Sequence, residues 1–451
     1  MAGKHGTDGY QGKRVLVLGL ARSGISALRL LREEGAIVSG ADENAAVALP
    51  PDVAGTPVHL GSFGANLLDD CEEVIVSPGI AIDHPLMLDA LSRGIPLASE
   101  LELGFRFAKA RIIAVTGTNG KSTTVTMIGE ILKAAGRRAI VCGNVGLPFC
   151  SVVRELGAAG FFVLEVSSFQ LETITSFHPE VAGILNLTPD HLDRYHSVEE
   201  YYRFKTRIIE RCGASDAFVF NALDRRCAEI AGTFAGRTIP FSSAGPVAGG
   251  VYLAGTELIR VHGGRNEAFL EREALGVIGL HNVENALAAV ASLEPFDVPV
   301  EACRRALSEF KGLPHRMENV GVVRGVTYYN DSKGTNVEAT MMTLKGLDRP
   351  TVLIAGGHDK GGVFTKLIPM LGRVKAIVTI GEAAPLIEEA LGSVVPIARA
   401  RTMMDAVETA ARTAQPGELV LLSPACASFD MFRNFEHRGE VFRECVKELQ
   451  R

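Results

Sequence analysis

RIIAVTGTNGKSTT, residues 111–124, is the stretch that decides the fold. It begins as a β-branched apolar run, breaks into a glycine loop and continues into Lys-Ser-Thr, which predicts a strand, a turn and the start of a helix. Gly117 and Gly120 let backbone N–H groups turn toward an anion, and Lys121 adds a positive charge. Ser122 or Thr123 can offer a hydroxyl to magnesium. We therefore expect this loop to bind a nucleoside triphosphate.

The spacing of this loop departs from the general G-x-x-x-x-G-K-[ST] pattern. Position 115 is Val, and Gly117 is the first glycine, so the loop is shorter. The alternative is a tight strand-to-helix turn with a solvated lysine. Turn chemistry alone does not explain Gly-x-x-Gly-Lys-Ser-Thr directly after an apolar strand, which favours the phosphate loop.

Composition limits the class of protein. At 451 residues the chain exceeds what one core usually serves, so we expect two or three domains. A net charge of -6 provides no basic surface for nucleic acid. The eight cysteines show no C-x-x-C pair or zinc-ligand spacing, and the first apolar run, residues 15–20, is too short for a signal peptide or membrane span. We expect a cytoplasmic, monomeric protein with no nucleic-acid or membrane partner.

The N-terminal segment predicts a βαβ unit of the dinucleotide-binding type. Residues 14–19 and 36–42 are short apolar strands, and a helix between them ends before Gly35. The middle glycine of the usual fingerprint is replaced by Ala21, which argues against a classical NAD site. Either a related nucleotide is bound through Arg22, Ser23 and Asp42, or this turn holds no ligand.

Two polar residues stand out on the strands after the phosphate loop. Residues 138–146 predict a strand that ends in a loop carrying the amide of Asn144, and residues 161–168 place Glu165 within an apolar strand. A buried carboxylate needs a cation or hydrogen-bond donors, because burying an unpaired charge is costly. We expect Mg²⁺ as the partner of Glu165, with a buried ion pair as the alternative.

His191 and Lys205 are two further candidates. His191 lies in the TPDHLD loop, residues 188–193, at the carboxyl end of a predicted strand, where ligands of open α/β sheets gather. It is a metal or phosphate contact, or only a hydrogen-bonded surface residue. Ser197-Val-Glu-Glu200 is a capping box that begins a helix. Lys205 falls on the apolar stripe of that helix, so it either extends its ammonium to solvent or has a chemical role. The apolar positions of the stripe are 201, 204, 208 and 209.

The last third of the chain repeats the alternation of strand and helix, which predicts parallel sheets. Residues 213–275 before it are strand-rich and offer no chemistry. Residues 281–285, HNVEN, begin a helix with a histidine and amides that either receive a nucleotide or only cap the helix. Residues 330–336, NDSKGTN, hold five polar or charged side chains between a strand and a helix, more than capping requires. This turn therefore favours a function.

Two more strand ends in this region carry small or charged residues. A strand from residue 352 opens into glycines with Lys360, which either meets a carboxylate or is a solvated loop cation. A strand over 418–422 is followed by small residues over 423–428, and Phe435 lies one helical stretch later. The small residues leave room for a ligand, or they permit close packing of a helix on a strand.

Together these motifs closely resemble those of the Mur ligases of peptidoglycan synthesis, over almost the whole chain. Two strings, SPACASFDMFRNFEHRG at 423–439 and SPGI at 77–80, are similar to those of the family member that adds D-glutamate. The chain has no Asp-Asn-Pro-Arg string of the kind found in the diaminopimelate-adding relative. The strings are GTNGKST at 117–123, LEVSSFQLE at 164–172, HNVENALAA at 281–289, PHRME at 314–318, NDSKGTN at 330–336 and SPACASFDMFRNFEHRG at 423–439.

The resemblance implies an ATP-dependent ligation that forms an amide, with Mg²⁺ as cofactor. Its substrates would be ATP, UDP-N-acetylmuramoyl-L-alanine and D-glutamate. The L-alanyl carboxylate would take the γ-phosphoryl group, and the amine of D-glutamate would then displace phosphate. The runner-up enzymes are a member that adds another amino acid and one that glutamates a folate. A nucleotide-binding regulatory protein would bind ATP without turnover, and it would not need the polar turn at 330–336.

The resemblance also implies an α/β fold of three domains. These are an N-terminal Rossmann-like domain for the UDP substrate over 1–105, a central ATP-binding domain with a parallel sheet over 106–312, and a C-terminal Rossmann-like domain for the amino acid over 313–451.

The resemblance assigns roles to individual residues. The residues implied to contact ATP are Gly117, Thr118, Asn119, Gly120, Lys121, Ser122, Thr123, Asn282, Arg316 and Asp331. The implied metal ligands are Ser122, Glu165, His191 and Lys205, the last as a carbamate that bridges metal. The implied catalytic residues are Lys121, Asn144, His191 and Lys205. The implied substrate contacts are Arg22, Ser23 and Asp42 for the uridine nucleotide, Asn144 near the reacting carboxylate, and Thr335, Lys360, Ser428 and Phe435 for D-glutamate.

Overall fold

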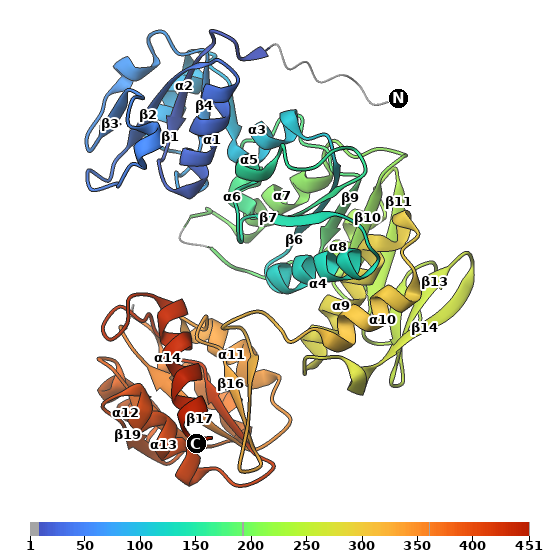
Figure 1. Cartoon of the computed structure of the whole chain (residues 1–451), viewed down its shortest axis with the longest axis vertical. Helices are drawn as coiled ribbons and strands as arrows, with labels where there is room; N and C mark the ends of the chain where they lie inside the picture. Colours follow the sequence, from blue (N-terminus) through green and yellow to red (C-terminus); the bar gives the residue numbers. More distant parts are fainter. Residues whose placement is uncertain (1–8, 192–193, 360, 451) are drawn as a thin grey trace. The chain divides into compact units, whose positions relative to one another are not determined.

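The computed structural model describes residues 9–191, 194–359 and 361–450. The chain divides into two compact units. The first runs to Leu275 and includes Val283–Ser308, and the second consists of Gly276–Asn282 and the chain from Glu309 onward. The first unit holds two sheets and the second unit holds one (Figure 1).

The N-terminal sheet of the first unit has five parallel strands in the order β3-β2-β1-β4-β5. Because β1 lies between β2 and β4, the strand order reverses direction beside β1, which is where open α/β sheets bind ligands. The strands are β1 (Arg14–Leu18), β2 (Ile37–Asp42), β3 (Val58–Leu60), β4 (Glu73–Val76) and β5 (Leu97–Ser99). The helices are α1 (Arg22–Glu33), α2 (Pro85–Ser92) and α3 (Glu100–Phe107).

Alternation along β1 explains why this sheet is covered on both faces. Val15 and Val17 belong to the cluster that contains Leu28 of α1. Leu16 and Leu18 belong to a different cluster, with Leu86 of α2. Successive side chains of a strand point to opposite faces, so an unbroken apolar run buries both faces of a parallel sheet.

The central sheet of the first unit has nine strands in the order β14-β13-β12-β11-β10-β9-β6-β8-β7. Neighbouring strands among β6 to β12 all pair in parallel. The pairs β12–β13 and β13–β14 are antiparallel. The strands are β6 (Arg111–Thr116), β7 (Ala139–Gly143), β8 (Phe161–Glu165), β9 (Val181–Ile184), β10 (Ala217–Asn221), β11 (Arg237–Ser242), β12 (Val251–Ala254), β13 (Glu257–His262) and β14 (Arg265–Glu271). The helices are α4 (Lys121–Ala134), α5 (Phe149–Val152), α6 (Ser168–Leu171), α7 (Val198–Thr206), α8 (Arg225–Ala231), α9 (Leu280–Leu293) and α10 (Val300–Glu309).

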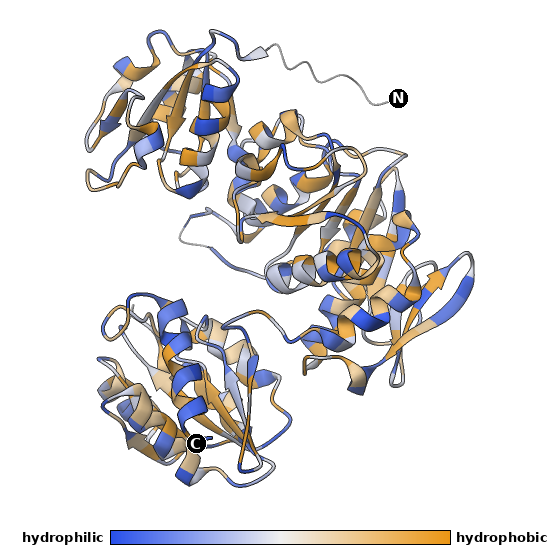
Figure 2. Ribbon diagram, in the orientation of Figure 1, coloured by the Kyte–Doolittle hydropathy of each residue, from blue (hydrophilic) through white to orange (hydrophobic). Residues whose placement is uncertain are grey.

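The sheet of the second unit has six strands in the order β15-β16-β20-β17-β18-β19, all parallel except the β15–β16 pair. The strands are β15 (Glu318–Val323), β16 (Val326–Asn330), β17 (Thr351–Gly356), β18 (Val374–Ile380), β19 (Ile397–Arg399) and β20 (Leu419–Leu422). The helices are α11 (Val337–Lys345), α12 (Ala384–Leu391), α13 (Met403–Thr413) and α14 (Phe435–Glu448), with a 3-10 helix over Phe364–Arg373. Figure 2 shows strands mainly in hydrophobic colours and helices in both colours, as expected for helices packed on a sheet.

The α/β architecture with parallel-rich sheets confirms the predicted fold class. Residues 276–282, placed in the central domain by the sequence, group with the second unit. The boundaries 1–105, 106–312 and 313–451 stay predictions. None of the helices in the described ranges has the length and apolar character of a membrane span.

Two glutamates of α3 connect the N-terminal sheet to the elements of the central sheet. Glu102 accepts hydrogen bonds from the backbone N–H groups of Thr175, Ser176 and Phe177. Glu100 accepts one from the N–H of Cys150 at 2.6 Å through Oε1, while Oε2 is buried without a hydrogen-bond partner among the described residues. Burial raises the pKa of the Glu100 carboxyl to about 7. Folding therefore keeps this group protonated up to neutral pH.

We predict that the free energy of unfolding of Glu100→Gln exceeds that of wild type by more at pH 8 than at pH 5. The raised pKa means that the folded state holds a proton that the unfolded state releases above about pH 4.5, so wild-type stability falls as pH rises toward 7. The full cost is about 3 kcal/mol at ~1.4 kcal/mol per pKa unit. Chemical unfolding at both pH values measures it. Glu130→Gln, at an exposed site on α4, is the control. An equal effect of Glu100→Gln at both pH values would contradict the prediction.

Candidate active site

The predicted phosphate loop follows β6 and ends where α4 begins at Lys121. Gly117 and Gly120 have φ values of 147° and 83°, which side chains rarely adopt. A Cβ on Gly120 would also lie 2.3 Å from Oδ1 of Asn285. Both glycines are thus required by backbone geometry and by close packing. The N-terminus of a helix of 14 residues directs its free N–H groups toward this loop.

Asn186, which the sequence did not single out, holds the loop in place. It follows β9, the neighbour of β6. Its Oδ1 accepts from the N–H of Asn119 at 2.8 Å, and its Nδ2 donates to the carbonyl of Asn119 at 3.2 Å. The hydroxyl of Thr118 donates to the carbonyl of Thr188 at 2.9 Å. A polar residue at the end of an apolar strand was the available signal.

Two lysines donate to one carbonyl of the loop. Nζ of Lys121 lies 2.7 Å from the oxygen of Gly117 and 2.8 Å from that of Thr118. Nζ of Lys205 lies 2.8 Å from the same oxygen of Gly117. Lys205 is 2% exposed, so the alternative of an ammonium extended to solvent is wrong. Burial, together with repulsion from Lys121, holds the pKa of Lys205 well below its usual range.

The helix that carries Lys205 begins as predicted, with one difference. The Ser197 hydroxyl accepts from the N–H of Glu200, which is the first half of a capping box. The Glu200 carboxylate accepts from the N–H of His196 at 2.9 Å, one residue before the N-cap. The helix start is confirmed, and the reciprocal bond is shifted by one residue.

Glu165 and Asn144 meet at the ends of β8 and β7. Asn144 donates from Nδ2 to Oε1 of Glu165 at 2.7 Å, and its N–H donates to the Glu165 carbonyl at 2.9 Å. Glu165 is 3% exposed, and its Oε2 has no hydrogen-bond partner in the described part of the chain. A buried ion pair therefore does not account for this carboxylate. One buried, unpartnered anionic oxygen fits a cation.

The remaining predicted metal ligands, Ser122, His191 and Lys205, differ in burial and in their contacts. Ser122 is 4% exposed and opens α4 beside the loop. His191 is half-exposed, has φ of 53°, and packs its ring on Phe169 at 4.9 Å and on Tyr201 at 5.9 Å. Among the residues described, no group of three or more His, Cys, Asp and Glu side chains is gathered to hold a metal ion. Lys205 donates to the Gly117 carbonyl, and its Nζ offers none of the oxygen ligands that magnesium prefers.

The second unit gathers several predicted residues at the carboxyl ends of β16, β20 and β17. Asp331 is 6% exposed, and its Oδ2 accepts from the hydroxyls of Ser423 at 2.8 Å and Thr343 at 2.7 Å. Burial raises the pKa of Asp331 to about 6. Nε of Arg316 is buried without a hydrogen-bond partner in the described residues. Asn282, in the first turn of α9, donates from Nδ2 to the carbonyl of Ile278 at 2.7 Å.

Arg438 connects the turn at 330–336 with the loop at 423–428 and was not predicted. It is 0% exposed. Its guanidinium donates to the carbonyls of Cys426 and Ala427 at 3.1 Å each, and to the hydroxyl and carbonyl of Ser332 at 3.0 and 2.8 Å. Burial lowers the pKa of Arg438 to about 10. Its position on the buried stripe of α14, with Phe442, was a readable signal.

The residues predicted for the amino acid are distributed around this connection. The Ser332 hydroxyl donates to the carbonyl of Phe435 at 2.8 Å, where α14 begins. Ser428 is buried, and its carbonyl accepts from two N–H groups that follow it. Thr335 donates its N–H to the carbonyl of Lys333 at 2.8 Å. Lys360 lies outside the described residues.

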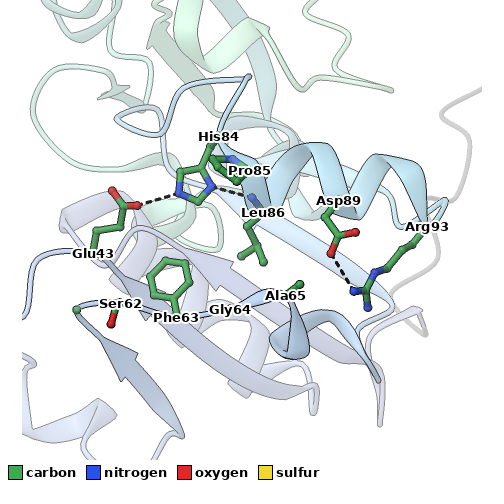
Figure 3. A pocket seen from close by; sticks show the side chains of 11 residues that line it. Glu43, Ser62, Phe63, Gly64, Ala65, His84, Pro85, Leu86, Asp89 and Arg93 are labelled. Atoms are coloured by element: carbon green, nitrogen blue, oxygen red, sulfur yellow. Dashed lines mark hydrogen bonds and ion pairs between the residues drawn. The ribbon is translucent and has the colours of Figure 1, made fainter.

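The N-terminal sheet carries the three predicted nucleotide residues and also a cavity of about 660 Å³, whose lining includes none of the three. Asp42 accepts through Oδ2 from the N–H of Leu20 at 2.6 Å, which fixes the turn after β1. Arg22, exposed, donates to the carbonyl of Gly146 at 3.4 Å, and Ser23 follows it in α1. Figure 3 shows His84 directed at Glu43, and the two rings of Phe63 and His84 on one side of the cavity. The cavity is lined by Glu43, residues 61–65, His84, Pro85, Leu86, Asp89 and Arg93.

Comparison with known proteins extends over nearly the whole chain. Three family models match it: "Mur ligase MurD-like, N-terminal domain" over residues 13–99, "Mur ligase middle domain" over 115–293 and "Mur ligase, glutamate ligase domain" over 315–426. A UDP-N-acetylmuramoylalanine--D-glutamate ligase of Koribacter versatilis is 40% identical, with 97% of this chain and 98% of that protein covered. A ligase of the same name from Salinibacter ruber is 42% identical, with 98% and 99% covered.

Solved structures share the fold at lower identity. A UDP-N-acetylmuramate-alanine ligase from Thermotoga maritima matches with a TM-score of 0.59 and 20% identity, over 96% of this chain and 99% of that one. A MurF ligase from Thermotoga maritima in complex with ADP matches with a TM-score of 0.58 and 14% identity, over 98% and 97%. At these identities the likeness concerns the fold alone.

Proposed function

The chain belongs to the Mur ligase family, and we propose that it joins D-glutamate to UDP-N-acetylmuramoyl-L-alanine with conversion of ATP to ADP and phosphate. The observation that carries the proposal is the 40–42% identity, over 97–98% of the chain, to relatives named for this reaction. The geometry of the phosphate loop and of Glu165 is consistent with it. The reaction belongs to peptidoglycan precursor synthesis.

The chemistry must bring two anions together. A carboxylate at about 4 Å from a phosphate oxygen is repelled by roughly 4 kcal/mol per charge pair at an effective dielectric near 20. Lys121 and the N–H groups at the start of α4 supply positive charge on the nucleotide side. Asn186 fixes the backbone of the loop at Asn119, whereas Nζ of Lys121, which donates to two loop carbonyls, would turn toward the phosphates.

The site also suits a magnesium ion. Glu165 would hold it through the unpartnered Oε2, together with the hydroxyl of Ser122, His191 and a modified Lys205. When bound, Mg²⁺ neutralises phosphate and carboxylate oxygens as they approach. Asn144 orients the Glu165 carboxylate through its other oxygen, Oε1, so that Oε2 remains available.

Lys205 is suited to carbamate formation. Its neutral amine would add to CO₂, which forms an N–C bond and releases one proton, so a neutral hydrogen-bond donor would become a negative acceptor. Only the neutral amine reacts, and burial beside Lys121 favours that form. The change also relieves the repulsion between two lysines that share the Gly117 carbonyl.

The ligation then proceeds in two displacements. A carboxylate oxygen of the L-alanyl group attacks the γ-phosphorus, and the bond to the β,γ-bridging oxygen breaks to release ADP. The D-glutamate amine attacks the carbonyl carbon of the acyl phosphate, and phosphate departs as the amine loses a proton. Lys121 stabilises negative charge on the transferred group, and Asn144 and His191 are placed to orient the carboxylate.

The remaining contacts follow the same proposal. Arg22, Ser23 and Asp42 would contact the uridine nucleotide. Asn282, Arg316 and Asp331 would contact ATP, and Thr335, Lys360, Ser428 and Phe435 would contact D-glutamate. A cytoplasmic location and a monomeric state stay predictions.

We predict that phosphate release by the purified protein requires ATP, Mg²⁺, UDP-N-acetylmuramoyl-L-alanine and D-glutamate together. L-glutamate, L-alanine, L-lysine and diaminopimelate should each support less than about 1% of that rate, because a site that pairs a specific polar group rejects analogues strongly. Coupled measurement of ADP and phosphate tests this. Turnover with another amino acid and none with D-glutamate would assign the chain to a different reaction.

We predict that Lys205→Arg lowers kcat by at least about 100-fold, since arginine keeps a positive charge and cannot form the same carbamate. The affinity for ADP, measured by calorimetry, should stay within about threefold, because Lys121 and the loop remain. Lys133→Arg, at an exposed position on α4, is the matched control and should retain full activity. Wild-type turnover in Lys205→Arg would remove the carbamate from the account.

A further inference from the structure

Arg194 connects the loop that holds His191 to a turn of the N-terminal sheet. Its Nη1 donates to the carbonyl of Pro78 at 3.0 Å, and its Nη2 donates to the carbonyl of Ile80 at 2.7 Å. The same guanidinium contacts the Glu172 carboxylate at 3.2 and 2.7 Å and lies 4.1 Å above the ring of Phe169. The side chain of Arg194 is 14% exposed and that of Glu172 is 3% exposed. One largely buried guanidinium therefore connects its own loop with the turn at 78–80 and with the segment that carries Phe169 and Glu172.

The turn at 77–80 lies at the reversal point of the first sheet. It follows β4, which pairs with β1. The Ser77 hydroxyl donates to the carbonyl of Gly19 at 2.7 Å, and a Cβ on Gly19 would lie 2.8 Å from that of Ser77. The turns after β1 and β4 are therefore in close contact. A displacement of 77–80 would move the turn that precedes Arg22 and Ser23.

At its other end Arg194 is connected to His191. The N–H groups of Arg194 and Tyr195 donate to the carbonyl of His191 at 3.0 and 3.1 Å. The ring of Phe169, which lies against the Arg194 guanidinium, also packs on the His191 ring at 4.9 Å. The Tyr195 hydroxyl donates to Glu172 at 2.7 Å and closes the network.

We propose that Arg194 is a positioning residue that sets the distance between the sugar-nucleotide site on the N-terminal sheet and the reacting carboxylate at the phosphate loop. The inference rests on the proposed function. The substrate would have its nucleotide on one sheet and its carboxylate at the other, so catalysis requires a fixed distance between these two sites. A misplacement of about 1 Å costs on the order of 100-fold in rate.

The choice of arginine fits this role. A planar guanidinium has five N–H donors in a fixed fork, so it can bind two carbonyls and a carboxylate together. A lysine at this position has a single nitrogen and cannot span the same acceptors. Glu172 supplies the counter-charge that makes burial of the guanidinium tolerable.

The kinetic test compares Arg194→Lys and Arg194→Gln with wild type in the full chain. We expect kcat with UDP-N-acetylmuramoyl-L-alanine to fall about 10- to 100-fold, while KM for ATP and affinity for ADP stay within about twofold. Glu172→Gln should also lower kcat. In the double variant kcat should fall by less than the product of the two single reductions. Arg203→Gln, an exposed arginine on α7, is the control and should keep wild-type kcat.

Hydrogen exchange supplies a readout that does not depend on turnover. In Arg194→Gln, or in Arg194→Lys if the first variant does not fold, amides of segments 77–81 and 194–196 should exchange about tenfold faster. Those of 111–124 should not change. Unchanged exchange at 77–81, unchanged kcat, or parallel loss of ADP binding would overturn the inference. If wild type itself gave no turnover, the proposed function would fail, and the exchange result would still decide whether Arg194 holds this turn.

Discussion

The constraint on which the rest of the active site depends is the convergence of two lysine side chains on the carbonyl of Gly117. Lys121 reaches it from the first residue of α4, and Lys205 reaches it from a separate helix at the same distance range, 2.7 to 2.8 Å. Burial and the charge of Lys121 hold the pKa of Lys205 well below its usual range, while Asp190 and Glu165 act in the opposite sense. In the proposed function, Lys121 would meet phosphate and carboxylate oxygens, and the amine of Lys205 would be converted to a carbamate. Glu165 adds an unpartnered oxygen to the same edge of the sheet.

The same principle organises the two sheets of the first unit and the one sheet of the second. In parallel sheets the carboxyl ends of neighbouring strands meet, so polar residues that follow separate strands become neighbours. In the first unit, Asp42 fixes the turn after β1 and Asn186 fixes the phosphate loop. In the second unit, Ser423 and Thr343 hold Asp331. The strand ends thus bring polar groups that are distant in sequence to one edge of each sheet.

Local patterns predicted much of this arrangement. The apolar runs gave the strands, the glycines at 117 and 120 gave the phosphate loop, and the position of Lys205 on an apolar stripe indicated its burial. Residues whose partners are distant in sequence were missed. Asn186 binds a residue 67 positions away, Arg194 binds one 116 positions away, and Arg438 binds one 106 positions away. Such pairings depend on strand order, which periodicity does not encode. Arg438 was still readable, because it shares the buried stripe of α14. The binding roles of the individual site residues stay predictions.

The proposed function depends on direct transfer of the γ-phosphoryl group to the substrate carboxylate at the Gly117 loop. Isotope labelling tests this step, with UDP-N-acetylmuramoyl-L-alanine carrying ¹⁸O in both carboxylate oxygens and mass analysis of the inorganic phosphate after ligation of D-glutamate. Direct transfer places one ¹⁸O atom in each phosphate released and leaves the other in the amide. Phosphate free of ¹⁸O during active ligation would contradict an acyl phosphate, and with it the role assigned to the loop.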